Sequence, residues 1–96
     1  MKEVNVKDVP DNAQLIDVRE VDEFNEVHAK GAVNLPLSNL THLADKIDPD
    51  QPIYLICRSG GRSAQAAEYL ENVRGWEAIN VLGGTTEWVE QGLPTE

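Results

Sequence analysis

The chain has 96 residues, 41 % of them hydrophobic and 26 % charged, a composition typical of one small globular domain and unlike that of disordered or fibrous proteins. Its 17 acidic and 8 basic residues give a formal net charge of −9, which repels nucleic acid and anionic lipid, so neither is expected as a partner. The single cysteine, Cys57, excludes an intramolecular disulfide and a structural zinc site built on paired cysteines, so we expect one domain over residues 1–96 that is held together by packing.

Short apolar runs alternate with segments of helical period along the chain, which predicts an α/β fold built from βα units around a mainly parallel sheet. The predicted strands are Glu3–Val6, Leu15–Val18, Val33–Leu35, Ile53–Ile56 and Ala78–Val81. The fourth is apolar throughout, as is typical of a central strand covered on both faces. The predicted helices are Val21–Val27, Leu40–Ile47, Ser63–Arg74 and Thr86–Gln91.

The third predicted helix has the clearest pattern. Ala66, Leu70 and Val73 share one face at helical spacing, which should pack on the sheet, and Gly75 is a suitable C-terminal cap. At the first predicted helix, by contrast, the acidic residues Glu20, Asp22, Glu23 and Glu26 are interpreted as a solvated face.

No segment is typical of a membrane or secreted protein. The N-terminal residues lack the apolar run of a secretory signal, and the longest uninterrupted apolar stretch, Ile53–Cys57, is far too short to cross a bilayer. We therefore expect a soluble, cytoplasmic protein with no membrane partner.

The segment Cys57–Ser63 carries the residues best suited to chemistry. It leads from the carboxyl end of the central strand into the third helix, and this is where open α/β sheets bind ligands. Gly60 and Gly61 allow a turn with inward amides, and the helix start adds its positive dipole end, so the segment predicts an anion cradle. Dipoles and arginines there favour the thiolate, which is the nucleophilic form of cysteine. The catalytic candidate is Cys57, and the substrate-binding candidates are Arg58, Ser59, Gly60, Gly61, Arg62 and Ser63.

The distribution of charge supports an anion site at this segment. No acidic residue occurs between Gln51 and Ala67, although the window holds Arg58 and Arg62. A buried structural cysteine before a glycine-rich turn is the alternative interpretation of Cys57. Ser59 and Ser63 can likewise donate to a bound anion or simply cap the helix.

Two further positions are supporting candidates. Asp17 ends a predicted strand, and Arg19 follows on the same side of an extended chain. The carboxylate could orient groups of the loop, but we favour a buried ion pair between the two residues that fixes the strand end. His28 could act as a general base for the cysteine.

Three blocks of the sequence resemble the rhodanese-like sulfurtransferase family, specifically its small single-domain type. The segment Cys57–Ser63 is similar to the family's active-site loop, in which backbone amides of the residues after a catalytic cysteine face its sulfur. The first signature block is matched by Leu15–Glu20, Glu23-Phe24 and His28–Pro36, and the closing block by Val81–Gly84, Trp88 and Gly92–Pro94. The resemblance implies a five-stranded, mainly parallel sheet with helices on both faces and a structural role for His28.

The resemblance also implies an activity, that of a thiosulfate sulfurtransferase. The Cys57 thiolate would attack the outer sulfur of thiosulfate or a related small anionic donor, sulfite would leave, and cyanide, a thiol or a protein acceptor would take the sulfur from the Cys57 persulfide. Inward amides with Arg58 and Arg62 would stabilise the negative charge. No metal or organic cofactor is implied, because the cysteine itself carries the sulfur.

The sequence leaves two alternative functions to compare with sulfur transfer. A cysteine-dependent phosphatase or arsenate reductase uses a similar loop but needs an arginine six positions after the cysteine, where this chain has Ser63 and its nearest arginine is Arg62. A sulfur-relay or regulatory binding module of the same fold is the other alternative, and it is compatible with an intact loop.

Overall fold

The computed structural model describes residues 1–96 and contains one five-stranded sheet in which all paired strands run parallel. The strands are β1 Lys2–Asn5, β2 Gln14–Asp17, β3 Val33–Asn34, β4 Ile53–Ile56 and β5 Ala78–Leu82. Their order in the sheet is β1-β5-β4-β2-β3. All five predicted strands are therefore confirmed to within about a residue or two at their ends, and β4 is the central strand, as predicted.

The connections between strands contain four α-helices and several shorter turns. The α-helices are α1 Val21–Glu26, α2 Leu40–Leu43, α3 Gly61–Tyr69 and α4 Gly84–Glu90. The 3-10 turns are η1 Val6–Asp8, η2 Leu37–Asn39 and η3 Ala44–Lys46, and a wider π-helical segment, η4 Leu70–Arg74, continues α3. The second predicted helix is thus divided into α2 and η3, whereas α3 and α4 each begin two residues earlier than predicted.

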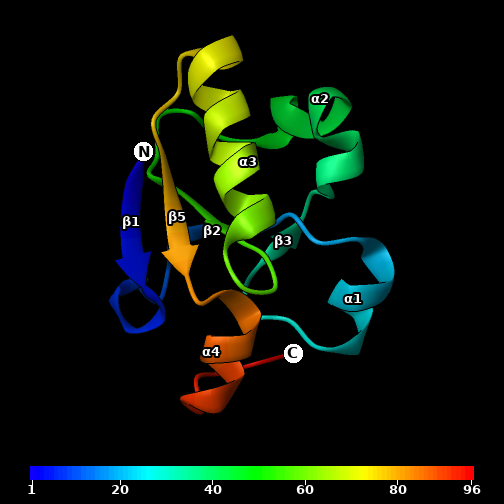
Figure 1. Ribbon diagram of the computed structural model, residues 1–96, viewed down its shortest axis with the longest axis vertical. Coiled ribbons are helices and arrows are strands. Elements are labelled where there is room, and N and C mark those ends of the chain that lie inside the picture. Colours follow the sequence, from blue (N-terminus) through cyan, green and yellow to red (C-terminus); the bar gives the residue numbers. More distant parts are fainter.

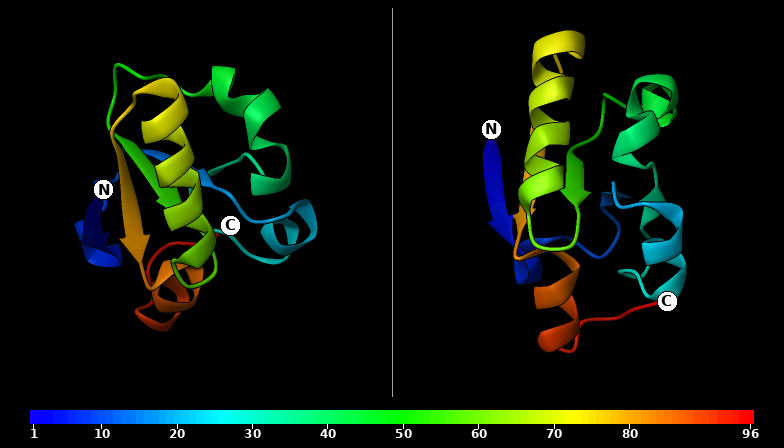
Figure 2. Two further views of the ribbon diagram at one scale, coloured as in Figure 1. Left: turned by 45° about the horizontal axis from the view of Figure 1, so that its top comes forward. Right: turned by 45° about the vertical axis from the view of Figure 1, so that its right-hand side comes forward.

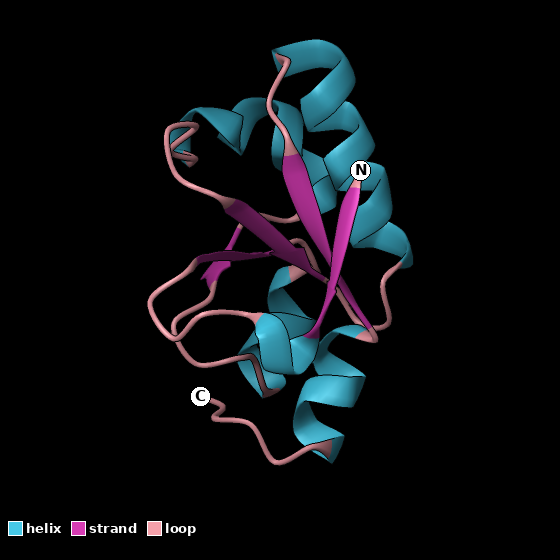
Figure 3. Cartoon of the chain, turned by 90° about the vertical axis from the view of Figure 1, so that its left-hand side faces the viewer, coloured by secondary structure: helices cyan, strands magenta, loops and turns pink.

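Two apolar clusters lie on opposite faces of the sheet, because side chains alternate along each strand. Leu55 of β4 faces the cluster built with α2, η3 and α3, and Ile56 faces the cluster built with η1 and α4. Figure 1 shows α3 running along β5, and Figure 3 shows the twisted strands with helices on both sides. The expected arrangement of helices on both faces is confirmed.

The C-terminal part of the third predicted helix, which the structure forms as η4, differs from its prediction. Ala66 and Leu70 are fully buried, but Val73 is 64 % exposed. The π-helical winding of Leu70–Arg74 takes more residues per turn than an α-helix, so it rotates Val73 off the buried face. Gly75 then ends the segment with φ +71°, which confirms it as the C-terminal cap.

The sheet places one loop at the carboxyl end of its central strand, between β4 and α3. Figure 2 shows α1 and α2 toward the opposite edge of the molecule from β1. The helix α1 therefore lies on the side of this loop where β2 and β3 are found. No helix of the chain is both long and apolar enough to cross a membrane.

Candidate active site

The chain turns sharply after Cys57, and Gly60 makes that turn possible. Gly60 has φ +118°, a conformation that residues with a Cβ rarely adopt, and α3 begins at the next residue. The turn brings the Gly60 N–H to 3.1 Å from Cys57 Sγ, to which it donates a hydrogen bond. Cys57 is 1 % exposed, so its sulfur lies beneath the loop at the start of α3.

Ser63, in the first turn of α3, places its hydroxyl on the same sulfur. Its Oγ lies 3.3 Å from Cys57 Sγ, and the residue is fully buried. It does not cap the helix, because the N-cap is Gly60 and no side chain caps it. Burial raises the pKa of the Cys57 thiol. The hydrogen bonds from the Ser63 hydroxyl and from the backbone N–H groups of Ser63, Gly60 and Ser59 lower this pKa by more than burial raises it, so it lies below its usual range.

The start of α4 donates hydrogen bonds to the backbone of the loop. Thr85 donates two hydrogen bonds to the Cys57 carbonyl oxygen, from its backbone N–H at 2.8 Å and from Oγ1 at 3.0 Å. The Thr86 N–H donates to the Arg58 carbonyl oxygen at 3.1 Å. A Cβ on Gly84 would lie 2.5 Å from the carbonyl oxygens of Cys57 and Arg58, so only glycine permits this approach. Sequence reasoning did not assign Thr85 or Gly84 to the site, although a Gly-Gly pair directly after a strand was a signal for close packing.

Asn80 of β5 is a second contributor that sequence reasoning missed. It is 2 % exposed and lies beside the loop, where its Nδ2 donates to the Gly60 carbonyl oxygen at 3.2 Å. Its Oδ1 accepts a hydrogen bond from the Ser63 hydroxyl at 2.5 Å. A polar residue in the otherwise apolar sequence Ala78–Val81 was the signal available for it.

The two arginines of the loop have different surroundings. Arg62 makes two hydrogen bonds with the Glu23 carboxylate of α1, at 2.6 and 2.9 Å. These bonds raise the pKa of Arg62 and, above all other causes, lower the pKa of Glu23 to about 2. The expectation of a solvated face therefore fails at Glu23, and the charge window along the sequence overlooked it because Glu23 reaches the loop from another element.

Arg58 is exposed and forms no ion pair. It lines a cavity of about 410 Å³ next to the loop. Thr85 and Thr86 border the same cavity, and its acidic lining residues are Glu23, Glu26 and Glu90. Ser59 is also exposed, and Gly61 needs no special backbone conformation, since only Gly60 of the two has positive φ.

Asp17 and Arg19 form the buried ion pair favoured from the sequence. The Arg19 guanidinium donates to both carboxylate oxygens of Asp17, at 2.8 to 3.1 Å. Arg19 is 5 % exposed and Asp17 is 0 % exposed. A further hydrogen bond, 2.6 Å long, joins Arg19 Nη2 to the Val27 carbonyl oxygen and fastens the end of α1. The pair makes no hydrogen bond to the Cys57 loop.

His28 makes its side-chain contacts away from the Cys57 thiol. Nδ1 lies 2.7 Å from the Phe24 carbonyl oxygen, Nε2 lies 3.3 Å from a carboxylate oxygen of Glu96, and the ring stacks on Phe24. These contacts join α1 to the C-terminal segment, so the structure forms no Cys-His pair. No cluster of three or more His, Cys, Asp or Glu side chains is arranged to hold a metal ion.

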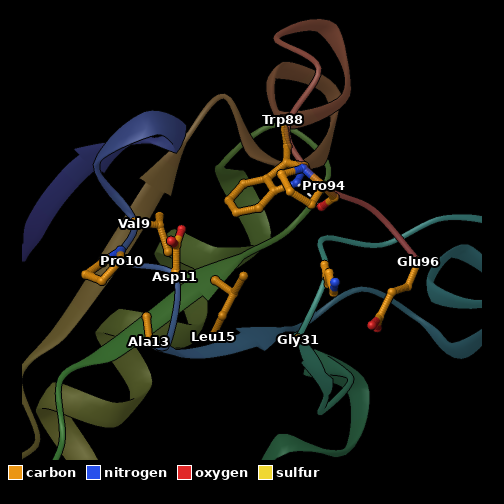
Figure 4. A pocket seen from close by; sticks show the side chains of 10 residues that line it. Val9, Pro10, Asp11, Ala13, Leu15, Gly31, Trp88, Pro94 and Glu96 are labelled. Atoms are coloured by element: carbon orange, nitrogen blue, oxygen red, sulfur yellow. Dashed lines mark hydrogen bonds between the residues drawn. The ribbon is translucent and has the colours of Figure 1, made fainter.

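A separate cavity of about 440 Å³ lies away from the loop. Figure 4 shows Trp88 and Pro94 on one side of this cavity, opposite Ala13 and Leu15. Trp88 is 7 % exposed and donates from Nε1 to the Pro94 carbonyl oxygen, so its polar group is satisfied within the protein.

The sequence was compared with protein families, curated proteins and solved structures. Residues 3–91 match the family described as the rhodanese-like domain. A relative named thiosulfate sulfurtransferase GlpE, from Vibrio cholerae, is 34 % identical over 88 % of this chain and 79 % of its own length. The adenylyltransferase and sulfurtransferase uba4 of Ogataea parapolymorpha is 35 % identical over 80 % of this chain.

Solved structures agree in fold along the whole chain. A rhodanese-related protein from Thermoplasma volcanium superimposes with a TM-score of 0.91 at 30 % identity, covering 100 % of this chain and 98 % of its own. Some curated relatives are longer, since the chain spans 60 % of one, 44 % of another and 20 % of uba4. The family match nevertheless covers nearly the whole chain, and it agrees with the loop and sheet described above. The chain therefore belongs to the rhodanese-like domain family.

Proposed function

We propose that the protein is a sulfurtransferase that carries sulfane sulfur as a persulfide on Cys57. The observation that carries this proposal is the set of hydrogen-bond donors around one thiol, with the Gly60 N–H at 3.1 Å and the Ser63 hydroxyl at 3.3 Å from Sγ. Such preorganised donors favour negative charge on sulfur, both in the thiolate and in the persulfide anion. The sequence contains no other cysteine that could carry the sulfur.

The proposed reaction has two steps. In the first, the Cys57 thiolate attacks the outer sulfur of thiosulfate or a related donor; a new sulfur–sulfur bond forms, the donor's own sulfur–sulfur bond breaks, and sulfite leaves with the electron pair. In the second, cyanide or a thiolate acceptor attacks the outer sulfur of the persulfide, and the Cys57 thiolate leaves. The reaction needs no other redox partner, because the donor's sulfane sulfur is passed on at its original oxidation level.

Arg58 is proposed to bind the sulfonate oxygens of an anionic donor. Its guanidinium is exposed, unpaired and located on the cavity beside the loop. Arg62 is a weaker candidate for this role, because Glu23 already binds its guanidinium with two hydrogen bonds.

A sulfur-relay role is the second candidate, and the acidic lining of the same cavity favours it. Glu23, Glu26 and Glu90 surround the approach to Arg58, and the molecule as a whole carries −9, so a free dianion is repelled as it arrives. A protein donor or acceptor with a basic surface would be attracted instead. The relatives named sulfurtransferases support sulfur transfer in general and are compatible with either candidate.

A phosphatase function is not supported by the geometry of the loop. The sixth position after Cys57 is occupied by Ser63, whose hydroxyl contacts the sulfur, and the Arg62 guanidinium is held by α1. No guanidinium therefore closes the loop around a phosphate.

The proposal is tested by intact-mass spectrometry after incubation with thiosulfate. We expect the wild-type protein to gain the mass of one sulfur atom, to lose it on addition of cyanide, and to form thiocyanate in the process. The Cys57→Ser variant, which is nearly isosteric, should fold normally by circular dichroism and gain nothing. A sulfur adduct on Cys57→Ser, or turnover within about tenfold of wild type, would contradict the covalent mechanism.

The two candidates are separated by their donors. If a free anion is the donor, Arg58→Ala should reduce kcat/KM for thiosulfate by roughly 10- to 150-fold, the range expected for one charge-assisted hydrogen bond. A neutral persulfide donor should be affected much less. Equal losses for both donors would refute the role of Arg58, and loading by a protein persulfide far faster than by thiosulfate would favour the relay.

A further inference from the structure

Three groups compete for a single proton beside the Cys57 sulfur. The Ser63 hydroxyl has one proton and lies within hydrogen-bond distance of three acceptors: Cys57 Sγ at 3.3 Å, the Gly60 carbonyl oxygen at 3.2 Å and Asn80 Oδ1 at 2.5 Å. Ser63 is fully buried and Asn80 is 2 % exposed, so these groups find their partners within the protein. The acceptor that receives the proton therefore determines whether the hydroxyl presents a donor or a lone pair to the sulfur.

The orientation of the Asn80 amide follows from its other contact. Nδ2 lies 3.2 Å from the Gly60 carbonyl oxygen, which can only accept, so the amide nitrogen must be on that side. Oδ1 then faces the Ser63 hydroxyl and can also only accept. The contact between the Ser63 and Asn80 oxygens is the shortest of the three, and a proton between them keeps two lone pairs from facing each other in a buried site.

We propose that Asn80 is a positioning residue that competes with Cys57 for the Ser63 proton and so weakens the support that the Ser63 hydroxyl gives to the thiolate. With the Ser63 proton on Asn80, the Ser63 oxygen presents a lone pair to Sγ, and this lone pair can accept the thiol proton. When Cys57 ionises, the hydroxyl must rotate to donate to the thiolate, which leaves Asn80 Oδ1 without its donor. The backbone N–H groups that face the sulfur favour the thiolate throughout, and Asn80 limits how far the Ser63 hydroxyl adds to them.

This inference concerns the ionisation of the same thiol that the proposed function uses as its nucleophile. The charged groups around the thiol are Arg58 and Arg62 of the loop and α3, Glu23 of α1, and the Asp17–Arg19 pair at the end of β2. A neutral replacement of Asn80 leaves all of them in place. A change in the ionisation of Cys57 would then report the hydrogen bonds and not a change of charge.

The experiment measures the rate at which iodoacetamide alkylates Cys57 as a function of pH. Because Cys57 is the only cysteine, the alkylation rate reports this thiol alone. Asn80→Leu removes the acceptor at similar volume and frees the Ser63 proton, so the midpoint of the pH profile should move down. At pH values below the wild-type midpoint, alkylation should be roughly three- to tenfold faster. Should Asn80→Leu fail to fold, Asn80→Val makes the same test with a smaller side chain.

Asn80→Asp is the matched control. Like Asn80→Leu it removes the donor to the Gly60 carbonyl oxygen, but it keeps an acceptor for Ser63, and both this acceptor and its negative charge disfavour the thiolate, so the midpoint should move up. A midpoint that moves down in both variants would trace the effect to the lost donor at Gly60, and that result would overturn the proposal. A faster maximal rate with an unmoved midpoint, which is the sign of a more exposed thiol, would overturn it as well.

Dependence on Ser63 completes the test. In a Ser63→Ala background, Asn80→Leu should leave the midpoint unchanged, because no hydroxyl remains to redirect. An equal shift in both backgrounds would show that Asn80 acts on the thiol by another route and would refute the proposal. Alkylation involves no sulfur donor, so these outcomes are independent of whether the protein forms a persulfide.

Discussion

At the scale of single residues, the conformation of the loop Cys57–Ser63 depends on glycine at position 84. Gly84 has φ +57°, and a Cβ there would meet the carbonyl oxygens of Cys57 and Arg58 at 2.5 Å. Both oxygens also accept hydrogen bonds from the start of α4, so they cannot retreat without breaking them. A side chain at this position therefore strains its own backbone and also displaces the loop.

We predict that Gly84→Ala lowers the free energy of unfolding by more than the roughly 1 to 3 kcal/mol that left-handed backbone strain alone can cost. It should also change the alkylation rate of Cys57, because the loop moves. Gly92→Ala is the matched control, since Gly92 has φ +70° but open space around its Cα. Urea denaturation and thiol alkylation measure the two effects. Equal destabilisation by both variants, with unchanged alkylation, would contradict the close contact.

At the scale of elements, α1 is held to the molecule by polar contacts. None of its residues is fully buried. Glu23 makes two of these contacts. It forms a capping box with Glu20 at the helix start and an ion pair with Arg62. The side chains of Glu23 and Arg62 are 29 % and 33 % exposed, so solvent weakens this pair relative to a buried one.

We predict that Glu23→Gln lowers the free energy of unfolding at neutral pH by about 0.5 to 1 kcal/mol. The Arg62 hydrogen bonds lower the folded-state pKa of Glu23 to about 2 from an ordinary value of 4.5. The stabilisation is therefore complete above about pH 4.5 and is lost as the pH falls toward 2, so the two proteins should converge in acid. Denaturation curves at several pH values, with hydrogen exchange of the α1 amides, provide the measurement.

Glu26→Gln is the control for that comparison. Glu26 lies on the same short helix, is exposed and forms no ion pair, so its replacement should leave both stability and pH dependence nearly unchanged. A loss equal to that of Glu23→Gln would mean that the helix responds to total charge and not to the specific contact with Arg62.

At the scale of the whole molecule, the two apolar clusters share one sheet. Each contains or contacts one tryptophan, Trp76 beside the cluster under α3 and Trp88 within the cluster under α4. Leu55 and Ile56 are neighbours on β4 yet face opposite clusters. Loss of one cluster would expose the strand on which the other depends, so we propose that the chain unfolds as one cooperative domain.

We predict that the variants Trp76→Phe and Trp88→Phe each unfold in urea with coincident transitions by fluorescence and by circular dichroism. In each variant the remaining tryptophan reports one face of the sheet, whereas circular dichroism reports the whole chain. The absolute stabilities of the variants should differ, because Trp88 is buried and Trp76 is only partly buried. A fluorescence transition that precedes the circular dichroism transition in either variant would show that its cluster melts separately.

The sequence by itself determined the elements and the position of the loop Cys57–Ser63 between β4 and α3, because both depend on neighbours along the chain. Alternation of apolar runs with helical periods predicted all five strands and, with shifted bounds, the four α-helices, and Gly60 after Cys57 predicted the turn. The π-helical segment that exposes Val73 was not predictable in the same way, since its pattern of apolar residues fits an ordinary helix.

The tertiary structure decided what surrounds the loop, because those contacts join residues far apart in the sequence. Glu23 binds Arg62 across 39 positions, and Thr85 binds the Cys57 carbonyl oxygen across 28. The parallel crossovers bring the carboxyl ends of β2, β4 and β5 to one edge of the sheet, so polar groups from separate segments meet there. Hydrogen bonds and charges act through space, and their partners are known only once the order of the strands is known.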